Sequence, residues 1–313
     1  MNRLILVSKK ESKGGAAIAA RRLFKGLISA GREAIMLVQV AQPGNPGIVP
    51  LSIIEKYRER RERFERMGND LIRSRRKDPG VSAFSFPYPG MDLAALSGIE
   101  ATDIFNIHHV PGFVSVESVA RLNVGKNPVV LTLHDQWMFT GGCHYSGECA
   151  GYKEDCRDCP LLRGESRDIP ARVLQNKLRL WNDGLTVVAP SRWMRDCARS
   201  SRVFRNNRVE WIPNGLDVSV FSPVRRNRAK QELKIPSGTR VILFGAPSFR
   251  VRRKGFAEFL RALDHCMKDP DFARGVRNGR IRMAAFGRAG SQTQTGNLPI
   301  QWLGNVNHET DLV

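Results

Sequence analysis

The stretch Leu4–Val40, LILVSKKESKGGAAIAARRLFKGLISAGREAIMLVQV, determines the fold class that we expect. It opens with a continuous apolar run, which is typical of a buried parallel strand. A polar loop then ends in Gly14-Gly15, and apolar residues recur at helical spacing as far as Gly31, a common residue at helix C-termini. Ala34–Val40 is a second apolar run. This order of strand, glycine loop, helix and strand predicts an α/β protein whose sheet begins like a Rossmann domain.

The glycine loop differs from the GxGxxG fingerprint, so it gives little support for dinucleotide binding. A helix N-terminus nevertheless offers N–H groups and the positive end of a dipole to a phosphate. Glycine also lets the backbone approach a ligand closely because it has no Cβ. Two interpretations of Gly14-Gly15 therefore stay open, a phosphate-binding turn and a simple tight turn into a helix.

Further strand patterns extend both halves of the chain. The segment Leu216–Pro236 between them is polar and basic, which is typical of a domain boundary. We therefore expect one Rossmann-like domain over residues 1–215 and a second over residues 216–313. Because few strands are recognisable in the second domain, we expect it to be incomplete. The expected strands are Asp103–His109, Val129–Leu133, Leu185–Val188 and Val209–Ile212, then Val241–Phe244, Ile281–Phe286 and Ile300–Leu303.

The charge of the chain favours anionic partners, since 50 Lys and Arg against 30 Asp and Glu give a net charge of +20. Nucleic acid, acidic lipid headgroups and phosphorylated substrates all fit this charge. We expect a basic helix over Glu55–Lys77, either solvated, resting on an anionic membrane or bound to RNA. No apolar run is long enough for a signal peptide core or a membrane span. We therefore expect a cytoplasmic protein, with peripheral attachment to the inner face of the plasma membrane as an alternative.

A second stretch, Leu131–Leu162, carries the clearest chemical signal: LTLHDQWMFTGGCHYSGECAGYKEDCRDCPLL. Its apolar strand stops at His134-Asp135, and ligands of open α/β sheets bind at the carboxyl ends of strands. Adjacent strand residues point to opposite faces, so a direct dyad of these two residues is not expected. His134 alone could donate a hydrogen bond to a phosphate or a sugar hydroxyl.

The glycine-rich loop 141–162 contains four cysteines, Cys143, Cys149, Cys156 and Cys159. The last pair forms Cys-x2-Cys, a common metal knuckle, and four thiolates satisfy tetrahedral zinc. The wider gaps depart from the paired Cys-x2-Cys pattern, and the chain lacks the secretion signal of a disulfide-rich protein. Structural zinc, reduced packed thiols and disulfides therefore all remain open, and His144 could replace one sulfur.

A matching loop in the second half, Gly245–Gly255, reads GAPSFRVRRKG between a strand and a helix. It is either a solvated basic loop or a site whose cations hold a diphosphate. Its cations are Arg250, Arg252, Arg253 and Lys254.

Several segments, taken in order, resemble the retaining family 4 glycosyltransferases of the two-Rossmann GT-B fold. They are SKKESKGGAAIAARRL, the HDxWxxTGGCHY cysteine loop, VVAPSRWM, IPNGLD and RRKGF. The similarity extends over nearly the whole chain and is greatest to bacterial enzymes of exopolysaccharide and lipopolysaccharide assembly. It implies transfer of a sugar from a UDP- or GDP-sugar donor to a saccharide or lipid-linked acceptor, without a cofactor required for catalysis.

By this resemblance, Gly14-Gly15 would lie near the donor diphosphate and His134 would approach the transferred sugar. Lys254, with Arg253 beside it, would bind the diphosphate. The family usually has a glycine-arginine pair at the end of the second domain's first strand, where this chain has Gly245-Ala246. The neighbouring arginines would then have to supply the positive charge.

The family's E-x7-E segment would begin where this sequence ends. The resemblance therefore leaves open a fragment of a longer protein or an inactive, truncated remnant. A basic nucleic-acid-binding protein is the rival from another class. The order of the motifs favours the transferase, and no recognised RNA-binding module is visible.

Overall fold

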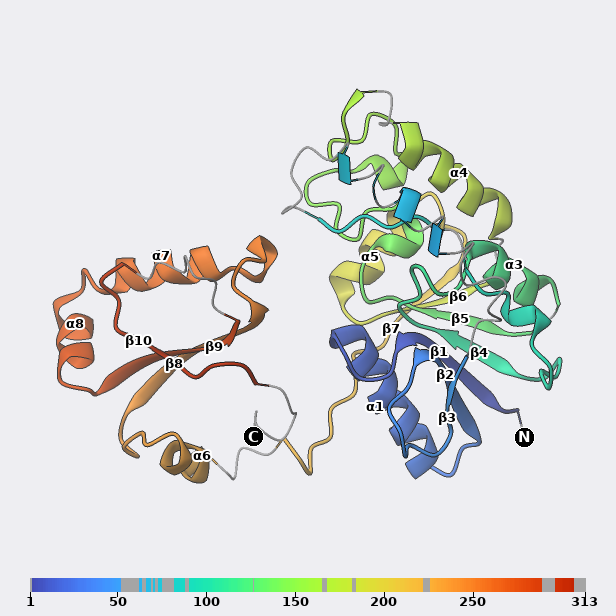
Figure 1. Ribbon diagram of the computed structural model, residues 1–313. Helices are drawn as coiled ribbons and strands as arrows, with labels where there is room; N and C mark the ends of the chain where they lie inside the picture. The colour runs from blue at the N-terminus through green and yellow to red at the C-terminus, as the bar shows by residue number, and fades with distance from the viewer. Residues whose placement is uncertain are drawn as a thin grey trace. The chain divides into compact units, whose positions relative to one another are not determined.

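In the computed structural model, the first part of the chain builds a seven-stranded parallel sheet in the order β3-β2-β1-β4-β5-β6-β7 (Figure 1). The strand order reverses between β1 and β4. In open α/β sheets, ligands bind at the carboxyl edge beside such a switch point. The strands are β1 (Leu4–Lys10), β2 (Ala34–Val40), β3 (Ile48–Pro50), β4 (Ile104–Ile107), β5 (Val129–Thr132), β6 (Thr186–Ala189) and β7 (Arg208–Trp211).

The chain divides into two units, Met1–Gly215 and Leu216–Val313. Most of the basic helix expected over Glu55–Lys77 lies outside the described residues, and so does the membrane or RNA surface attributed to it. The structure describes residues 2–51, 62–63, 66–68, 70, 73–74, 82–87, 90–125, 127–164, 168–181, 184–221, 226–288 and 296–306.

Helices cover both faces of the first sheet, which is why its strands are apolar on both sides. Successive strand residues alternate between the faces. Leu6 of β1 packs with Ala20 and Phe24 of α1 (Gly15–Ser29). Its neighbours Ile5 and Val7 belong to the larger core on the opposite face. That core also contains residues of α3 (Val116–Val124), α4 (Ile169–Leu180) and α5 (Arg192–Ser200).

Short 3-10 turns complete the first unit: η1 (Leu93–Ala95), η2 (Trp137–Phe139) and η3 (Gly151–Lys153). The turn η2 follows the carboxyl end of β5, and η3 lies within the loop 141–162. Among the residues that the structure describes, no helix combines the length and apolar character needed to cross a bilayer.

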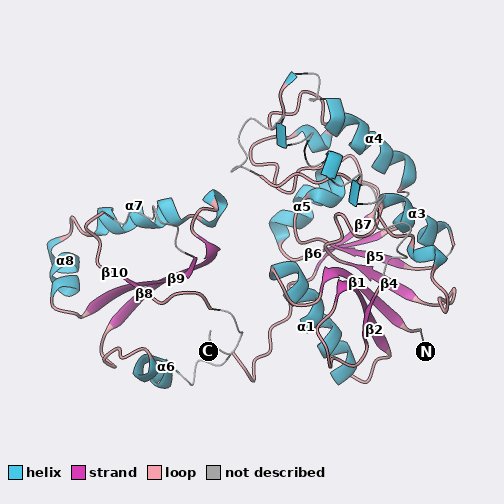
Figure 2. Cartoon of the chain, viewed as in Figure 1, coloured by secondary structure: helices cyan, strands magenta, loops and turns pink. Residues whose placement is uncertain are grey.

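The second unit contains a parallel sheet in the order β10-β9-β8. Its core is aromatic, with the rings of Phe249 and Phe256 stacked 4.4 Å apart. Figure 2 shows α7 and α8 on one side of this sheet and α6 on the other. The elements are α6 (Arg226–Glu232), β8 (Arg240–Ser248), η6 (Arg252–Lys254), α7 (Phe256–Cys266), α8 (Pro270–Arg277), β9 (Ile281–Arg288) and β10 (Ile300–Trp302).

We predict that Gly245→Ala destabilises the second unit. A Cβ at Gly245 would lie 2.0 Å from Phe286 Cζ, so the half-buried Phe286 ring would have to leave its present position. Forcing a side chain off its rotamer costs about 0.5–1.5 kcal/mol. Hydrogen exchange of the β8 and β9 amides should become faster. Gly238→Ala is the control, because its Cβ would meet no atom within 4 Å. Equal exchange rates in the two variants would contradict the prediction.

Candidate functional site

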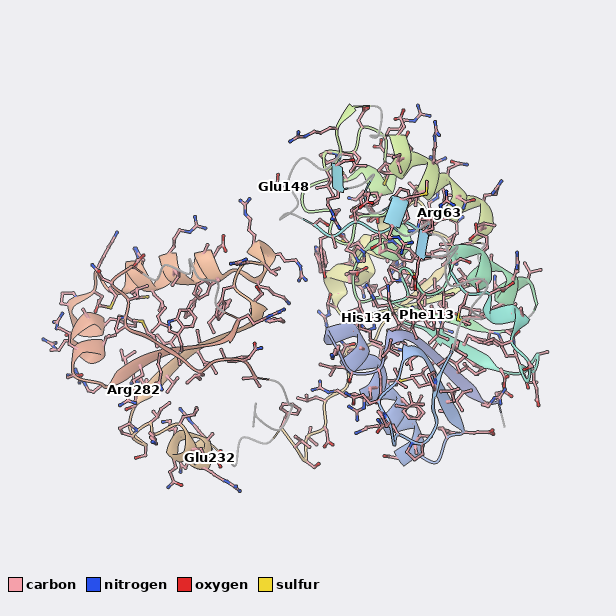
Figure 3. All side chains as sticks on the ribbon, viewed as in Figure 1. Arg63, Phe113, His134, Glu148, Glu232 and Arg282 are labelled. Carbon is pink, nitrogen blue, oxygen red and sulfur yellow. The ribbon has the colours of Figure 1, made fainter. Side chains whose placement is uncertain are left out.

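The carboxyl edge of the first sheet brings together the polar residues His108, His109, His134, Asp135 and His144, which we call the histidine edge. His108-His109 follow β4, the strand next to β1 at the switch point. His134-Asp135 follow β5, and His144 comes from the loop 141–162. Figure 3 labels His134 within the first unit.

The ends of β1 and β4 are tied together by backbone hydrogen bonds. The Lys9 amide donates to the His109 carbonyl at 3.0 Å, and the His108 amide donates to the Val7 carbonyl at 2.9 Å. The ammonium of Lys9 also donates to the Pro111 carbonyl at 2.9 Å. These bonds fix where the two histidines after β4 stand relative to the loop after β1.

His134 is paired with His108 and not with its sequence neighbour Asp135. The two rings are stacked, and His108 Nδ1 lies 2.9 Å from His134 Nε2. Burial, with a smaller contribution from the neighbouring His134, lowers the pKa of His108 to about 3. Burial also lowers the pKa of His134 to about 4, although the Asp135 carboxylate acts in the opposite direction. Both rings are therefore neutral near pH 7.

Asp135 points to different partners. Its Oδ2 lies 2.6 Å from His144 Nδ1, and its Oδ1 accepts from the Trp137 amide at 2.9 Å. If His144 Nδ1 carries the proton and donates it to Asp135, His144 Nε2 accepts from the Ser85 hydroxyl at 2.8 Å. His109 Nε2 stands 3.6 Å from Asp135 Oδ2. Asp135 thus lies between histidines of two separate segments.

The chain of Ser85, His144 and Asp135 has the hydrogen-bond distances of a hydrolytic triad. Its serine, however, is anchored at both backbone groups. The Ser85 amide donates to the Gly142 carbonyl at 2.9 Å, and the Ser85 carbonyl accepts from Trp137 Nε1 at 2.9 Å. These contacts join segment 82–87 to the loop 141–162, so we assign the three residues a structural role.

One metal-compatible set is present at the histidine edge in the described part of the chain. One ligand atom each of His109, Asp135 and His144 lies within 4.8 Å of the others. The Asp135–His144 hydrogen bond already satisfies two of these atoms. A metal would have to displace that bond, so the set is better suited to hydrogen bonding.

The four cysteines of the loop 141–162 line one small cavity of about 20 Å³. None of the four forms a disulfide in this structure. Burial raises the pKa of Cys143 to about 12 and that of Cys156 to about 11. His144, which could have replaced a sulfur, is instead directed to Asp135 and Ser85.

Lys177 of α4 is the buried charged residue that sequence reasoning missed. It is fully buried, and its ammonium donates to the carbonyls of Trp137 and Thr140. It also lies 4.2 Å from the centroid of the Trp137 ring. Burial lowers the pKa of Lys177 to about 7. The only sequence signal was a lysine on the apolar face of an amphipathic helix.

Gly14 and Gly15 stand at the start of α1, on the loop that follows β1. Gly14 has φ of 98°, which is accessible to glycine, and a Cβ at either position would meet no atom within 4 Å. The helix has no side-chain hydrogen bond at its N-cap. Buried Glu11 holds the preceding loop by accepting from the Gln42 amide at 2.6 Å and from Asn45 Nδ2 at 2.7 Å. The arrangement leaves room for an anion above the helix N-terminus.

In the second unit, Arg253 and Lys254 lie in η6, after the carboxyl end of β8, and both are exposed. Partial burial and the neighbouring Arg253 charge lower the pKa of Lys254. Gly255 then takes a left-handed conformation with φ of 78° and starts α7. Gly245-Ala246 lie inside β8, next to an irregularity in its pairing with β9. The strand therefore continues past the position where the family's glycine-arginine pair was expected.

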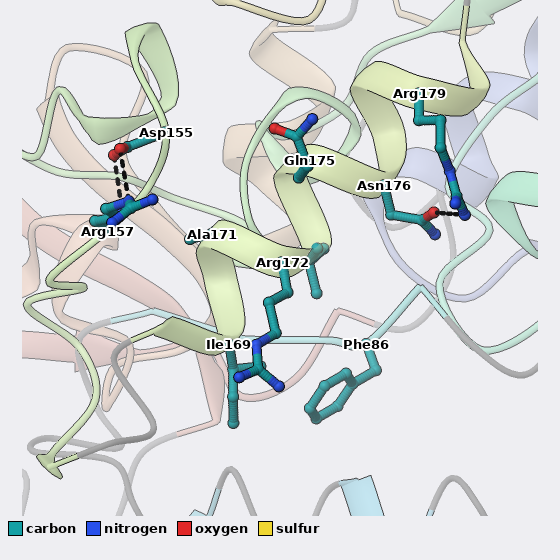
Figure 4. Close-up of a pocket in the computed structure, with 10 residues that line it drawn as sticks. Phe86, Asp155, Arg157, Ile169, Ala171, Arg172, Gln175, Asn176 and Arg179 are labelled. Atoms are coloured by element: carbon teal, nitrogen blue, oxygen red, sulfur yellow. Dashed lines mark hydrogen bonds and ion pairs between the residues drawn. The ribbon is translucent and has the colours of Figure 1, made fainter.

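A hollow of about 760 Å³ lies along α4 and contains none of these groups (Figure 4). It is open to solvent, and its lining residue Arg157 is paired with Asp155 at 3.0 Å. No residue of the histidine edge lines this hollow, and the histidine edge remains the better candidate site.

Residues 13–220 match the model of Glycosyltransferase Family 4. The chain belongs to glycosyltransferase family 4. The matched span includes Gly14, Gly15, His134 and the four cysteines, whereas Arg253 and Lys254 lie outside it. The family expected from the sequence is thereby confirmed.

One relative is WcaC of Escherichia coli (strain K12), a glycosyl transferase assigned to colanic acid biosynthesis. It is 28% identical over 120 residues, which cover 34% of this chain and 29% of WcaC. The matched region therefore spans less than a third of that relative's length.

Two solved structures share the fold over 99% of this chain at 12% identity. One is a glycosyltransferase from Rickettsia africae ESF-5, with a TM-score of 0.51 and 70% of its chain covered. The other is WaaG, a glycosyltransferase involved in lipopolysaccharide biosynthesis, with a TM-score of 0.50 and 72% covered. They confirm the expected fold class, an α/β chain with parallel sheets of the GT-B type.

We predict that acid destabilises this family 4 chain through His108 and His134. Their folded pKa values of about 3 and 4 lie below the ordinary value of 6.5. The unfolded chain therefore binds more protons as pH falls from 6.5 towards 4, and stability is lost in that window. Above pH 6.5 this contribution is constant.

Histidine-ring NMR signals would measure this directly. The signals, assigned with His108→Asn and His134→Asn variants, should remain those of neutral imidazole between pH 7.5 and pH 5. A protonation midpoint near pH 6.5 for either ring would show that burial does not act as described.

Proposed function

We propose that this chain transfers a sugar from a nucleoside diphosphate donor to a saccharide or lipid-linked acceptor in cell-surface polysaccharide biosynthesis. The observation that carries the proposal is the histidine edge at the switch point of the sheet, within the span that matches family 4. WcaC and WaaG are named for colanic acid and lipopolysaccharide biosynthesis respectively, which supports this substrate class.

The chemistry of sugar transfer fits the residues present. A departing nucleoside diphosphate accumulates negative charge, which cations and helix N-termini stabilise. We infer that the α1 N-terminus at Gly14-Gly15 meets a phosphate in the first unit. We also infer that Lys254, with Arg253 beside it, binds the diphosphate through charge-assisted hydrogen bonds. Retention of configuration through an oxocarbenium-like state would need no protein nucleophile.

His134 would contact the transferred sugar. Its Nε2 is engaged by His108, so Nδ1 is the ring nitrogen that would meet a sugar hydroxyl. A neutral ring suits this role, because a hydroxyl group is itself neutral and can both donate and accept. An imidazolium would instead bind phosphate.

The charge of +20 is also compatible with work beside an anionic membrane, where lipid-linked acceptors reside. Attachment of this kind would weaken as salt rises, since exposed charges are screened within about 8 Å at physiological ionic strength.

We predict that His134→Ala slows sugar transfer about twofold to tenfold, the value of one hydrogen bond between neutral groups. Binding of the nucleoside diphosphate should be little changed, because the diphosphate is assigned to other residues. The measurement compares turnover of UDP- and GDP-sugars with calorimetry of UDP and GDP. His265→Ala, an exposed histidine of α7, is the control. Wild-type turnover in His134→Ala would refute the assignment.

We predict that Lys254→Ala weakens binding of UDP or GDP about tenfold to a hundredfold, because a charge-assisted hydrogen bond is lost. Calorimetry measures the change. Lys268→Ala removes an equal charge from another exposed position of the second unit and should have little effect. Equal losses in both variants would indicate only general electrostatic attraction.

A further inference from the structure

We propose that Cys143, Cys149, Cys156 and Cys159 bind one zinc ion, forming a structural site that supports the histidine edge. The four residues line one cavity of about 20 Å³, which has room for a single ion or water molecule. Four thiolates are a complete ligand set for tetrahedral zinc. In this structure, no three of the four cysteine sulfurs lie within 4.8 Å of one another. In a tetrahedral zinc site the sulfurs lie about 3.8 Å apart. Zinc would therefore draw them inward.

The backbone around the cavity has features of a metal knuckle. The Gly151 amide donates to Cys149 Sγ at 3.4 Å, a bond that stabilises a thiolate more than a thiol. Cys156 and Asp158 have φ values of 56° and 49°, a left-handed conformation that is unfavourable for a residue such as cysteine. Such strain persists only where other interactions hold the backbone. Coordination of Cys156 and Cys159 would supply that interaction.

The surroundings of the cavity suit a group of negative charge. Lys177 is fully buried, and its Nζ donates to the carbonyls of Trp137 and Thr140. Cys143 and Cys156 are among the groups that act on this side chain. Zinc with four thiolates would carry a net charge of −2, and a neighbouring ammonium would stabilise it.

The cysteine site is joined to the histidine edge through the chain itself. The Thr140 hydroxyl donates to the Cys143 carbonyl at 2.5 Å, and His144 is the next residue. The Gln136 amide donates to the His144 carbonyl at 3.0 Å. Holding Cys143 therefore fixes His144, and with it the Asp135 carboxylate. Zinc would act here by positioning, as a closed four-ligand site does.

The test begins with metal content. Full-length chain purified reduced and without chelator should contain about one zinc by elemental analysis, and so should Cys266→Ser, whose thiol lies on α7. Cys156→Ser should lose the metal. His144→Ala should retain it, because the histidine is directed to Asp135 and Ser85. Zinc that survives Cys156→Ser but leaves with His144→Ala would place the metal at the histidine edge and overturn the proposal.

Cobalt provides a readout that does not depend on the folding of a variant. Wild-type chain loaded with Co²⁺ should show thiolate charge-transfer absorption and the intense visible bands of tetrahedral cobalt. Cys159→His should keep a tetrahedral spectrum with weaker charge transfer, since three cysteines and one histidine also bind zinc. Wild-type chain that is zinc-free and gives no such spectrum would leave packed thiols as the correct description.

Lys177 tests the charge argument separately. Lys177→Met should weaken zinc affinity about tenfold to a hundredfold, as expected for loss of an outer partner, whereas Lys177→Arg should retain more of it. Competition with a chromophoric chelator measures both values. Equal zinc affinities in Lys177→Met and the wild type would show that the lysine is not the counter-charge.

Discussion

The burial of Lys177 is the constraint on which the candidate site depends. Its ammonium binds the carbonyls of Trp137 and Thr140 and lies over the Trp137 ring, so it fixes both ends of η2. This turn carries the chain from the carboxyl end of β5 into the loop 141–162. A side chain that left this place would leave its buried Nζ and two carbonyl groups without these hydrogen bonds, which costs more than losing one exposed contact. The loop therefore has little freedom to rearrange.

A second consequence concerns Asp135 and the loop. Its carboxylate binds the Trp137 amide within the turn and His144 at the far side of the turn. Lys177 and Asp135 thus both form hydrogen bonds to the backbone of the turn η2, Lys177 to its carbonyls and Asp135 to an amide. The Ser85 contact extends this hold to segment 82–87. The result is a rigid support next to His134, and such support would position this ring for the sugar contact that we propose.

The position of a residue at the end of its own strand was predictable from the sequence. The residues from separate segments that meet at the histidine edge were not. His134 follows a plain apolar strand, so its place at the sheet edge was clear. His108 and His109 end another strand, but only the three-dimensional strand order makes β4 the neighbour of β1 and β5. His144 looked like a substitute for a sulfur because it adjoins Cys143. The three-residue strand Ile48–Pro50 lies in a Pro- and Gly-rich segment and has too few residues for a recognisable period.

Hydroxyl groups and phosphate groups require different partners, and this difference explains why neutral histidines suit the sheet edge of a strongly basic chain. In the proposed sugar transfer, a fixed positive charge next to the sugar would attract phosphate in place of hydroxyl groups. Burial suppresses that charge on His108 and His134, while exposed Lys254 retains a cation suited to a diphosphate. Burial likewise disfavours the charged form of Lys177. The negatively charged cysteine site that we propose would favour its ammonium without placing a second cation or anion among the histidines.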